Sequence, residues 1–338
     1  MKAIVCDKPF LLEVQERAVP ERQPGEVMIR ISRVGLCGTD YHIFSGNQPF
    51  LAYPRVMGHE LAGEVAEADE DTGLMVGQLV TINPYIPCGV CIACRKDKPN
   101  CCVNIKVLGV HCDGGMTEFL CVPASAVIPV EGLSPDQAAM VEFLSVGAHA
   151  VRRGQTTKGD RALVVGAGPI GVGVALFCQF AGAEVTLIDT SAERLSYARD
   201  KVGIHHVCPL GDELEDFLKA QTDGEFFDVV FDATGNGKAI EKGFSYVAHG
   251  GRYVLVSVVK DVISFSDPEF HKRETTLLGS RNATREDFEN VIDKLRSGLI
   301  PSDMLQTHNF DLLDTPTKIR ELMANQGSVL KAIARVGT

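Results

Sequence analysis

The sequence predicts an α/β protein of two parts, a β-rich domain and a domain built on a doubly wound parallel sheet. Its 338 residues are more than one domain of about 150 residues needs. Residues 1 to about 130 are dense in Gly, Pro and Val and contain alternating runs such as 26–31, which indicate short antiparallel strands joined by turns. From residue 160 to about 280, strand-like and helical runs alternate, and this alternation is typical of βαβ units.

The individual elements follow from local patterns. Ser134, Pro135 and Gln137 form a helix start, with a hydroxyl N-cap, a proline at the first helical position and a capping-box glutamine. Apolar runs predict the strands of the parallel sheet at 162–165, 184–188, 228–231, 253–257 and 275–278. A helix is predicted over 285–297. The tail from about 281 is too short for a third domain, so we expect it to pack onto one of the other two.

Composition and charge exclude several classes of protein. With 45% hydrophobic and 23% charged residues, the chain is too apolar to be disordered. Its formal net charge of −11 repels phosphate backbones and no basic block offsets it, so we expect no nucleic-acid partner. The uncharged stretch 162–183 is long enough to span a bilayer, but its glycines and its flanks predict a buried strand, turn and helix, and no membrane partner. The N-terminal residues lack a secretory signal, so we expect a cytoplasmic protein.

A glycine-rich turn follows the first predicted strand of the parallel sheet, with the spacing GxGxxG. Gly166 permits the tight turn, Gly168 lets backbone N–H groups approach a pyrophosphate, and Gly171 allows close packing of helix and strand. Asp189 ends the next strand, where a carboxylate binds the ribose of NAD and repels the 2′-phosphate of NADP. A turn that binds no nucleotide is the alternative. The predicted nucleotide-binding residues are Gly166, Gly168, Pro169, Ile170, Gly171, Asp189, Thr190, Arg194 and Thr234.

Five of the eleven cysteines cluster in one short segment, which predicts metal binding rather than disulfides. Cys88, Cys91 and Cys94 have the spacing CxxCxxC, and four thiolates at tetrahedral distance form a closed structural zinc site. The distance to the next cysteine is longer than iron–sulfur ligation of the ferredoxin type requires. The spacing leaves the fourth ligand open between Cys101 and Cys102.

A second set of candidate ligands is dispersed. Cys37 lies in a segment that also holds Thr39, Asp40 and His42, and His59 is followed directly by Glu60. Each of these residues alone has an ordinary structural explanation, such as a buried cysteine or a hydrogen-bonded histidine. Together, thiolate, imidazole and carboxylate ligands are typical of a catalytic zinc that keeps one position open.

These motifs, in this order and over essentially the whole chain, resemble the zinc-dependent medium-chain dehydrogenase/reductase family. The resemblance implies a GroES-like catalytic domain at 1–146, with 281–338 packed onto it, and a Rossmann NAD-binding domain at 147–280. It implies two zinc ions per chain and NAD as cofactors, and a homodimer or homotetramer. By the same resemblance, the ligands of the structural zinc are Cys88, Cys91, Cys94 and Cys102.

The resemblance also assigns the catalytic centre. Its zinc takes Cys37 and His59, and the candidates for the remaining ligand are Glu60 and Glu142. The family has a proline after the residue that matches Glu142, whereas this chain has Phe143. The resemblance also implies three further roles. Thr39 would be the hydroxyl that relays the substrate proton, and His42 the base that releases it. Asp40 would be the carboxylate that orients a zinc-bound imidazole.

Three segments, at 45–50, 109–115 and 266–282, resemble the sugar-acid branch of the family, which oxidises the 5-hydroxyl of L-galactonate or L-gulonate. Arg281 is a candidate for pairing with the substrate carboxylate, or for tying the two domains together, and Asn282 for bonding the hydroxyls. We therefore predict a zinc-dependent, NAD-linked dehydrogenase of a sugar acid. The alternatives are a dehydrogenase of a neutral polyol such as sorbitol, or of L-threonine, and a catalytically silent nucleotide-binding regulator.

Overall fold

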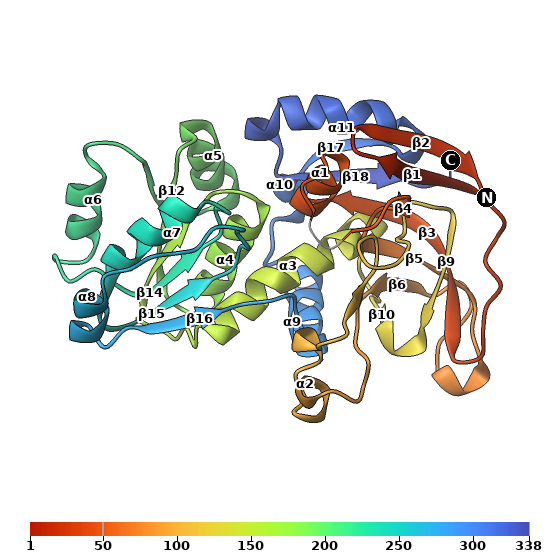
Figure 1. The fold of residues 1–338 in the computed structure, drawn as a ribbon, viewed down its shortest axis with the longest axis horizontal. Helices are drawn as coiled ribbons and strands as arrows, with labels where there is room; N and C mark the ends of the chain where they lie inside the picture. Colours follow the sequence, from red (N-terminus) through yellow and green to blue (C-terminus); the bar gives the residue numbers. More distant parts are fainter. Residues whose placement is uncertain (49–50, 338) are drawn as a thin grey trace. The chain divides into compact units, whose positions relative to one another are not determined.

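The computed structural model describes residues 1–48 and 51–337, and the chain divides into two compact units (Figure 1). Unit 1 consists of Met1–Phe143 and Ala283–Thr338, and unit 2 of Leu144–Asn282. Helix α3 (Pro135–Arg153) begins in unit 1 and ends in unit 2. Its predicted capping box is confirmed, because the N–H of Gln137 donates to Ser134 Oγ at 3.2 Å and the N–H of Ser134 donates to Gln137 Oε1 at 2.9 Å.

Unit 2 is built on one parallel sheet of six strands in the order β13-β12-β11-β14-β15-β16. The strands are β11 (Arg161–Val165), β12 (Glu184–Asp189), β13 (His206–Pro209), β14 (Phe227–Asp232), β15 (Val247–Leu255) and β16 (Thr276–Gly279). The helices between them are α4 (Pro169–Phe180), α5 (Ala192–Tyr197), α6 (Leu214–Gln221), α7 (Gly237–Gly243) and α8 (Asp267–Lys272). This order confirms the doubly wound sheet, and it reverses between β11 and β14, where such sheets bind ligands.

Two details of this sheet differ from the sequence prediction. Strand β13 was not predicted, because it is a short edge strand with only one fully buried side chain. The run at 253–257 predicts only the end of β15, since Gly250 and Gly251 interrupt the apolar pattern in the middle of that strand. No helix in the described part of the chain is both long enough and apolar enough to cross a membrane.

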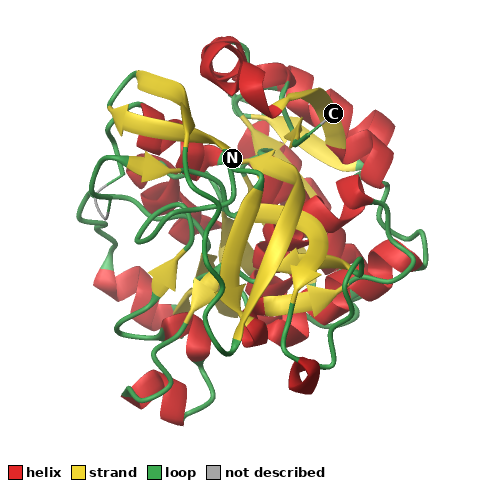
Figure 2. Cartoon of the chain, turned by 90° about the vertical axis from the view of Figure 1, so that its right-hand side faces the viewer, coloured by secondary structure: helices red, strands yellow, loops and turns green. Residues whose placement is uncertain are grey.

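Unit 1 contains a seven-stranded sheet, and Figure 2 shows long strands in the middle of the view from its side of the molecule. In this sheet β10, β6, β5, β3, β18 and β17 lie side by side, and β9 also pairs with β3. Its strands are β3 (Glu26–Leu36), β5 (Glu60–Glu67), β6 (Leu79–Ile82), β9 (Phe119–Pro123), β10 (Val127–Pro129), β17 (Gln306–Asp311) and β18 (Lys331–Arg335). All pairs are antiparallel except β17 with β18. Strand β18, from the end of the chain, therefore lies inside the sheet between β3 and β17.

Smaller elements complete unit 1. The remaining strands are β1 (Lys2–Lys8), β2 (Leu11–Glu16), β4 (Arg55–Val56), β7 (Tyr85–Ile86) and β8 (Lys106–Val107). The helices are α1 (Gly38–Phe44), α2 (Ile92–Arg95), α9 (Arg285–Arg296), α10 (Ser302–Leu305) and α11 (Thr315–Ala324). The core of the unit is aliphatic, with Ile29 and Ile31 of β3, Leu61 of β5 and Ala332 of β18 all buried. Helix α9 confirms the helix predicted over 285–297.

Candidate metal centres and nucleotide site

Four cysteine thiols converge in the loop around α2. The sulfur of Cys91 lies 3.5 Å from that of Cys94 and 3.9 Å from that of Cys102, and the N–H of Cys88 donates to Cys102 Sγ at 3.2 Å. All four sulfur atoms lie within 4.8 Å of one another. Cys102 is buried within this group, whereas Cys101 is exposed and lies outside it. The set has the number, chemistry and spacing of ligands that a closed tetrahedral zinc site needs.

Backbone N–H groups of the same loop favour the ionised form of the Cys91 thiol, whereas burial and the neighbouring thiols raise the pKa of Cys94 to about 11. Backbone N–H groups of Cys94 and Val103 donate to Cys91 and lower the pKa of its thiol to about 6. A thiolate, and not a thiol, is the form that binds zinc. The loop therefore prepares at least this ligand before any ion arrives.

A second cluster forms where β3 ends and α1 begins. Cys37 is the N-cap residue of α1, and its Sγ accepts a hydrogen bond from the N–H of Thr39 at 3.2 Å. The same sulfur lies 3.0 Å from Nε2 of His59, in the turn that leads into β5. Asp40 is completely buried and accepts the N–H of Cys37 at 3.0 Å. Ligand atoms of Cys37, Asp40 and His59 all lie within 4.8 Å of one another.

Two glutamates reach this cluster, and each has a different partner. Atoms of His59, Glu60 and Glu142 lie within 4.8 Å of one another. Glu142, on α3, accepts a hydrogen bond from the hydroxyl of Tyr85, and burial raises its pKa to about 7. Glu60 forms an ion pair with Lys331 at 2.6 Å, and neither side chain reaches solvent.

The cluster fits a divalent cation. The thiol of Cys37 and the carboxyl groups of Asp40, Glu60 and Glu142 gather around His59. Burial lowers the pKa of His59, but the nearby Cys37, Asp40 and Glu142 raise it well above its usual value. Acidic groups still outnumber the bases His59 and Lys331, and burying acidic groups without partners is costly unless a cation compensates them. Nδ1 of His59 and Oδ1 of Asp40 are buried and have no hydrogen-bond partner in the described part of the chain. A thiolate, an imidazole and a carboxylate are the ligands of a catalytic zinc with an open position.

The two predicted proton carriers lie on α1. Thr39 is half-buried in the first turn of the helix, and His42 is exposed in the last turn. Their spacing of three places both on one face of the helix. The structure thus orders them from the buried cluster toward solvent. The segment 45–50 follows directly, but Pro49 and Phe50 lie outside the described residues.

The loop at 109–115 supports the backbone that carries His59. The N–H of Gly114 donates to the carbonyl of Val56 at 2.8 Å. A Cβ added at Gly114 would lie 2.2 Å from the carbonyl oxygen of Gly58, so a larger residue does not fit there. The loop therefore fixes the turn that leads to the histidine.

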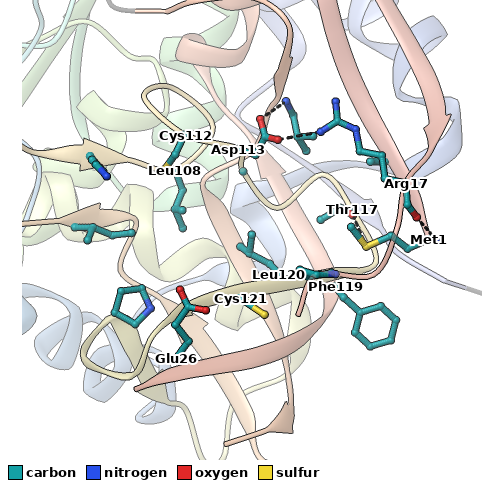
Figure 3. A pocket seen from close by; sticks show the side chains of 17 residues that line it. Met1, Arg17, Glu26, Leu108, Cys112, Asp113, Thr117, Phe119, Leu120 and Cys121 are labelled. Atoms are coloured by element: carbon teal, nitrogen blue, oxygen red, sulfur yellow. Dashed lines mark hydrogen bonds and ion pairs between the residues drawn. The ribbon is translucent and has the colours of Figure 1, made fainter. Parts of the chain in front are cut away.

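A cavity of about 440 Å³ lies in unit 1, and residues such as Met1, Thr117 and Cys121 line it (Figure 3). Asp113 at its edge accepts a hydrogen bond from Arg17 at 2.9 Å (Figure 3). It also accepts one from Arg55 at 3.1 Å, so two cations balance its charge. Among the described residues, the lining includes no member of either metal cluster. The cavity therefore has no part in the chemistry of those clusters.

In unit 2, the glycine-rich turn has the predicted geometry. Gly166 has a φ of +107°, which favours glycine. A Cβ added at Gly171 would lie 1.8 Å from the carbonyl oxygen of Gly166, so the start of α4, beyond Pro169 and Ile170, packs directly on the turn. A Cβ at Gly168, the N-cap residue of α4, would meet no protein atom within 4 Å. The N-terminus of α4 therefore stays open to an anion such as a pyrophosphate.

Asp189 ties the ends of two neighbouring strands together. Its carboxylate accepts the N–H of Ala167 at 2.6 Å and the N–H of Ser191 at 2.7 Å. Because a carboxylate offers about four lone-pair sites, acceptor capacity remains for ribose hydroxyls. Thr190 follows it and is exposed, and Arg194 lies half-buried in α5.

Thr234 and its neighbours form the second turn at this sheet edge. The N–H and the hydroxyl of Thr234 both donate to the buried carboxylate of Asp232, at 3.0 and 2.9 Å. Ser257 donates to the same carboxylate at 3.1 Å. The N–H of Ala233 donates to the carbonyl of Val165 at 2.9 Å, so this turn lies beside the glycine-rich one.

Arg281 and Asn282 follow β16 at the same edge of the parallel sheet. Arg281 is exposed, and Asn282 is half-buried with a φ of +55°. Because all six strands are parallel, their carboxyl ends share one edge, and both residues lie on the edge that carries the glycine-rich turn.

The sequence did not predict two residues that contact the candidate ligands. Tyr85 donates to Glu142, and Lys331 pairs with Glu60. A signal for Lys331 exists, because it interrupts the apolar run 329–334.

Both units of the chain match families of known dehydrogenases. The alcohol dehydrogenase GroES-like domain family matches residues 23–132, and the zinc-binding dehydrogenase family matches residues 169–297. The chain is 40% identical to L-galactonate-5-dehydrogenase of Escherichia coli strain K12 over 334 residues, which cover 98% of each protein.

Two solved structures share the fold over nearly their whole length. The alcohol dehydrogenase rspB of Escherichia coli CFT073, crystallised with NADH, has a TM-score of 0.92 at 30% identity and covers 99% of both chains. L-idonate 5-dehydrogenase of Escherichia coli K-12 has a TM-score of 0.91 at 26% identity, covering 99% of this chain and 97% of its own.

Proposed function

The chain belongs to the zinc-dependent alcohol dehydrogenase family and is an oxidoreductase, and we propose that it oxidises a secondary alcohol of a sugar acid to the keto acid, with NAD as the hydride acceptor. The substrates we propose are L-gulonate and L-galactonate, oxidised at C5. The observation that carries the proposal is the pair of groups that share His59, with Cys37 and Asp40 in one and Glu60 and Glu142 in the other. The relative named for L-galactonate supports the substrate class.

The cluster in unit 1 would hold the catalytic zinc. Its protein ligands in this proposal are Cys37 and His59, with a glutamate as the third. A zinc ion bound there supplies a Lewis acid that lowers the pKa of a substrate hydroxyl. Asp40, whose Oδ1 is buried without a partner among the described residues, would orient His59 through its Nδ1.

The proton of the hydroxyl leaves along α1 in this proposal. Thr39, half-buried next to Cys37, accepts it and passes it on, and His42 releases it to solvent. The increasing exposure from Cys37 and Thr39 to His42 supports that direction. A relay of this kind is needed because His59 and the two glutamates are buried away from water.

NAD would bind to unit 2 and, when bound, supplies the carbon that accepts the hydride. Backbone N–H groups at Gly168 and the start of α4 would bind its pyrophosphate, and Asp189 its adenosine ribose. Thr234 would contact it from the neighbouring turn. Asp189 favours NAD over NADP, because its charge repels a 2′-phosphate.

Arg281 and Asn282 are the proposed substrate-binding residues. Both lie at the sheet edge that carries the nucleotide turn, and both are accessible at least in part. A guanidinium can bind the carboxylate of a sugar acid with two hydrogen bonds, and an amide can bind its hydroxyls.

The test is the initial rate of NADH formation with L-gulonate, L-galactonate, sorbitol and L-threonine measured side by side. We expect one hexonate to exceed the other two classes at least about tenfold in kcat/KM, which corresponds to about 1.4 kcal/mol of transition-state binding. A preference for sorbitol or L-threonine would contradict the substrate, while retaining the metal and the cofactor. A protein with zinc only at the four cysteines and no NADH formation would be a silent nucleotide-binding protein.

A further inference from the structure

The side chain of Glu60 crosses a neighbouring strand to reach its partner. Glu60 begins β5, Lys331 begins β18, and β3 lies between these two strands in the sheet. The residue of β3 opposite Glu60 is Gly35. A Cβ added at Gly35 would lie 2.1 Å from Glu60 Oε2, so the carboxylate occupies the space that any other residue would fill.

The ammonium group of Lys331 is fully used by this arrangement. It donates to both carboxylate oxygens of Glu60 at 2.6 Å and to the carbonyl of Leu36 at 3.2 Å. An ammonium has three donors, so none remains for another partner. Nζ also lies 4.2 Å from the ring centre of Phe143, the residue that follows Glu142. These three hydrogen bonds and the ring of Phe143 therefore fix the position of the Lys331 ammonium group.

The two glutamates next to His59 are restrained to different degrees. The cation Lys331 binds both carboxylate oxygens of Glu60, whereas one neutral phenol binds one oxygen of Glu142. An ionised carboxylate makes all of these bonds charge-assisted, but only Glu60 has two of them and a partner of opposite charge. Glu142 is therefore the carboxylate that turns toward a cation at lower cost.

We propose that Gly35, Glu60 and Lys331 form a clamp that keeps the carboxylate of Glu60 off the catalytic metal and leaves Glu142 as its third protein ligand. This inference rests on the zinc site of the proposed function. A catalytic zinc needs a position free for substrate. If both glutamates bound the ion together with Cys37 and His59, four protein ligands would close that position.

The test replaces the parts of the clamp and observes the metal directly. Lys331→Met removes the partner of Glu60, and Gly35→Ala displaces the carboxylate without changing any charge. Lys331→Met/Glu60→Gln is the matched control, because it removes the released carboxylate together with its partner. Each protein is loaded with Co²⁺, and its visible absorption spectrum is recorded without substrate or NAD.

We expect Lys331→Met and Gly35→Ala to show weaker d–d absorption than the wild type, because Co²⁺ absorbs strongly in tetrahedral sites and weakly at higher coordination number. The four-cysteine site contributes equally to all spectra and cancels in the difference. The additional ligand also slows removal of the metal by a chelator, by about tenfold or more. The double variant returns to the wild-type spectrum and rate.

The outcomes separate the clamp from the metal site itself. If the wild type binds two zinc ions and both single variants keep its Co²⁺ spectrum, the clamp is wrong and Lys331 has a structural role only. If the wild type binds zinc only at the four cysteines, the proposed catalytic site is wrong, and the clamp with it. Far-UV circular dichroism and retention of the four-cysteine zinc show that each variant is folded. Gly35→Ala decides the question if Lys331→Met does not fold.

Discussion

The hydroxyl of Tyr85 donates a hydrogen bond to the carboxylate of Glu142; both side chains are buried, and Glu142 lies beside His59. Tyr85→Phe removes this donor and leaves a buried carboxylate unsatisfied. We expect the free energy of unfolding of the zinc-free protein to fall by about 1–3 kcal/mol. The loss in the zinc-loaded protein is smaller, because the ion then compensates Glu142. Chemical denaturation of the two forms measures both values.

Tyr41→Phe is the matched control for this change. The hydroxyl of Tyr41 is also buried but has no hydrogen-bond partner in the described part of the chain. Its removal leaves no acceptor unpaired, so stability is expected to stay within about 0.5 kcal/mol of the wild type. Equal losses in the two variants would show that the bond to Glu142 contributes nothing.

Zinc uptake at the catalytic cluster is expected to weaken below neutral pH. Burial raises the pKa of Glu142 from 4.5 to about 7 in the metal-free protein, so the carboxyl is protonated below that pH. Only its ionised form binds the metal, and each zinc ion must then displace this proton. Protonation of this one group therefore lowers the affinity for zinc about tenfold per pH unit below pH 7 and leaves it unchanged above pH 7.

The measurement is the zinc dissociation constant between pH 5.5 and 8, determined by competition with a chelator. Glu142→Gln is the control, since it cannot release this proton but keeps the protons of Cys37 and His59. The slope for the wild type below pH 7 should exceed the slope for the variant by about one proton. Identical slopes would show that Glu142 is not a ligand.

The four-cysteine site is expected to distinguish two adjacent residues. Cys102 lies in the group of four sulfur atoms, and its neighbour Cys101 is exposed. Cys102→Ser should lose one zinc ion per chain and lower the melting temperature, because the free energy of metal binding also stabilises the folded loop. Cys101→Ser should keep the zinc content and the melting temperature of the wild type. Zinc analysis of the purified proteins decides, and loss of zinc from Cys101→Ser would contradict the assignment.

The features that could be predicted from the sequence are those formed by residues close together in the chain. The glycine spacing predicts the turn at Gly166, the capping box predicts the start of α3, and CxxCxxC predicts three of the four grouped cysteines. In each case the residues that interact lie close together in the chain. The spacing alone left Cys101 and Cys102 open; the family resemblance chose Cys102, and the structure groups its sulfur with the other three.

Long-range partners could not be predicted in the same way. Lys331 is 271 residues from Glu60, and lysine is ordinarily a surface residue, so only the position of β18 beside β3 makes it a buried partner. Tyr85 is 57 residues from Glu142 and lies in a strand of two residues. Both contacts result from tertiary pairing, which a local pattern does not encode.

Two glycines of the nucleotide turn should separate binding from stability. A methyl group at Gly171 would lie 1.8 Å from the carbonyl of Gly166, so Gly171→Ala should destabilise unit 2 by about 1–3 kcal/mol. Gly168→Ala meets no protein atom within 4 Å at an ordinary φ of −75°, so its stability should be unchanged. Its methyl group instead obstructs the approach of a pyrophosphate, and NADH affinity should fall about tenfold or more.

Thermal unfolding and NADH fluorescence titration measure the two effects independently. The expected result is a large change in stability for Gly171→Ala, and a change confined to affinity for Gly168→Ala. If Gly168→Ala binds NADH as tightly as the wild type, the pyrophosphate does not approach the N-terminus of α4. That outcome would remove the turn from the proposed cofactor site.

Arg281 provides the sharpest test of the substrate class. Arg281→Ala removes a group that we propose to bind the carboxylate of a hexonate, and a hydrogen-bonded charge of this kind contributes about 1.5–3 kcal/mol. The KM for L-gulonate or L-galactonate should therefore rise about tenfold or more. The KM for sorbitol, which has no carboxylate, should not change. Arg281→Lys should recover only part of the loss, because an ammonium cannot form the two parallel bonds of a guanidinium. Equal increases for hexonate and sorbitol would show that Arg281 supports the fold near β16 and does not recognise the carboxylate.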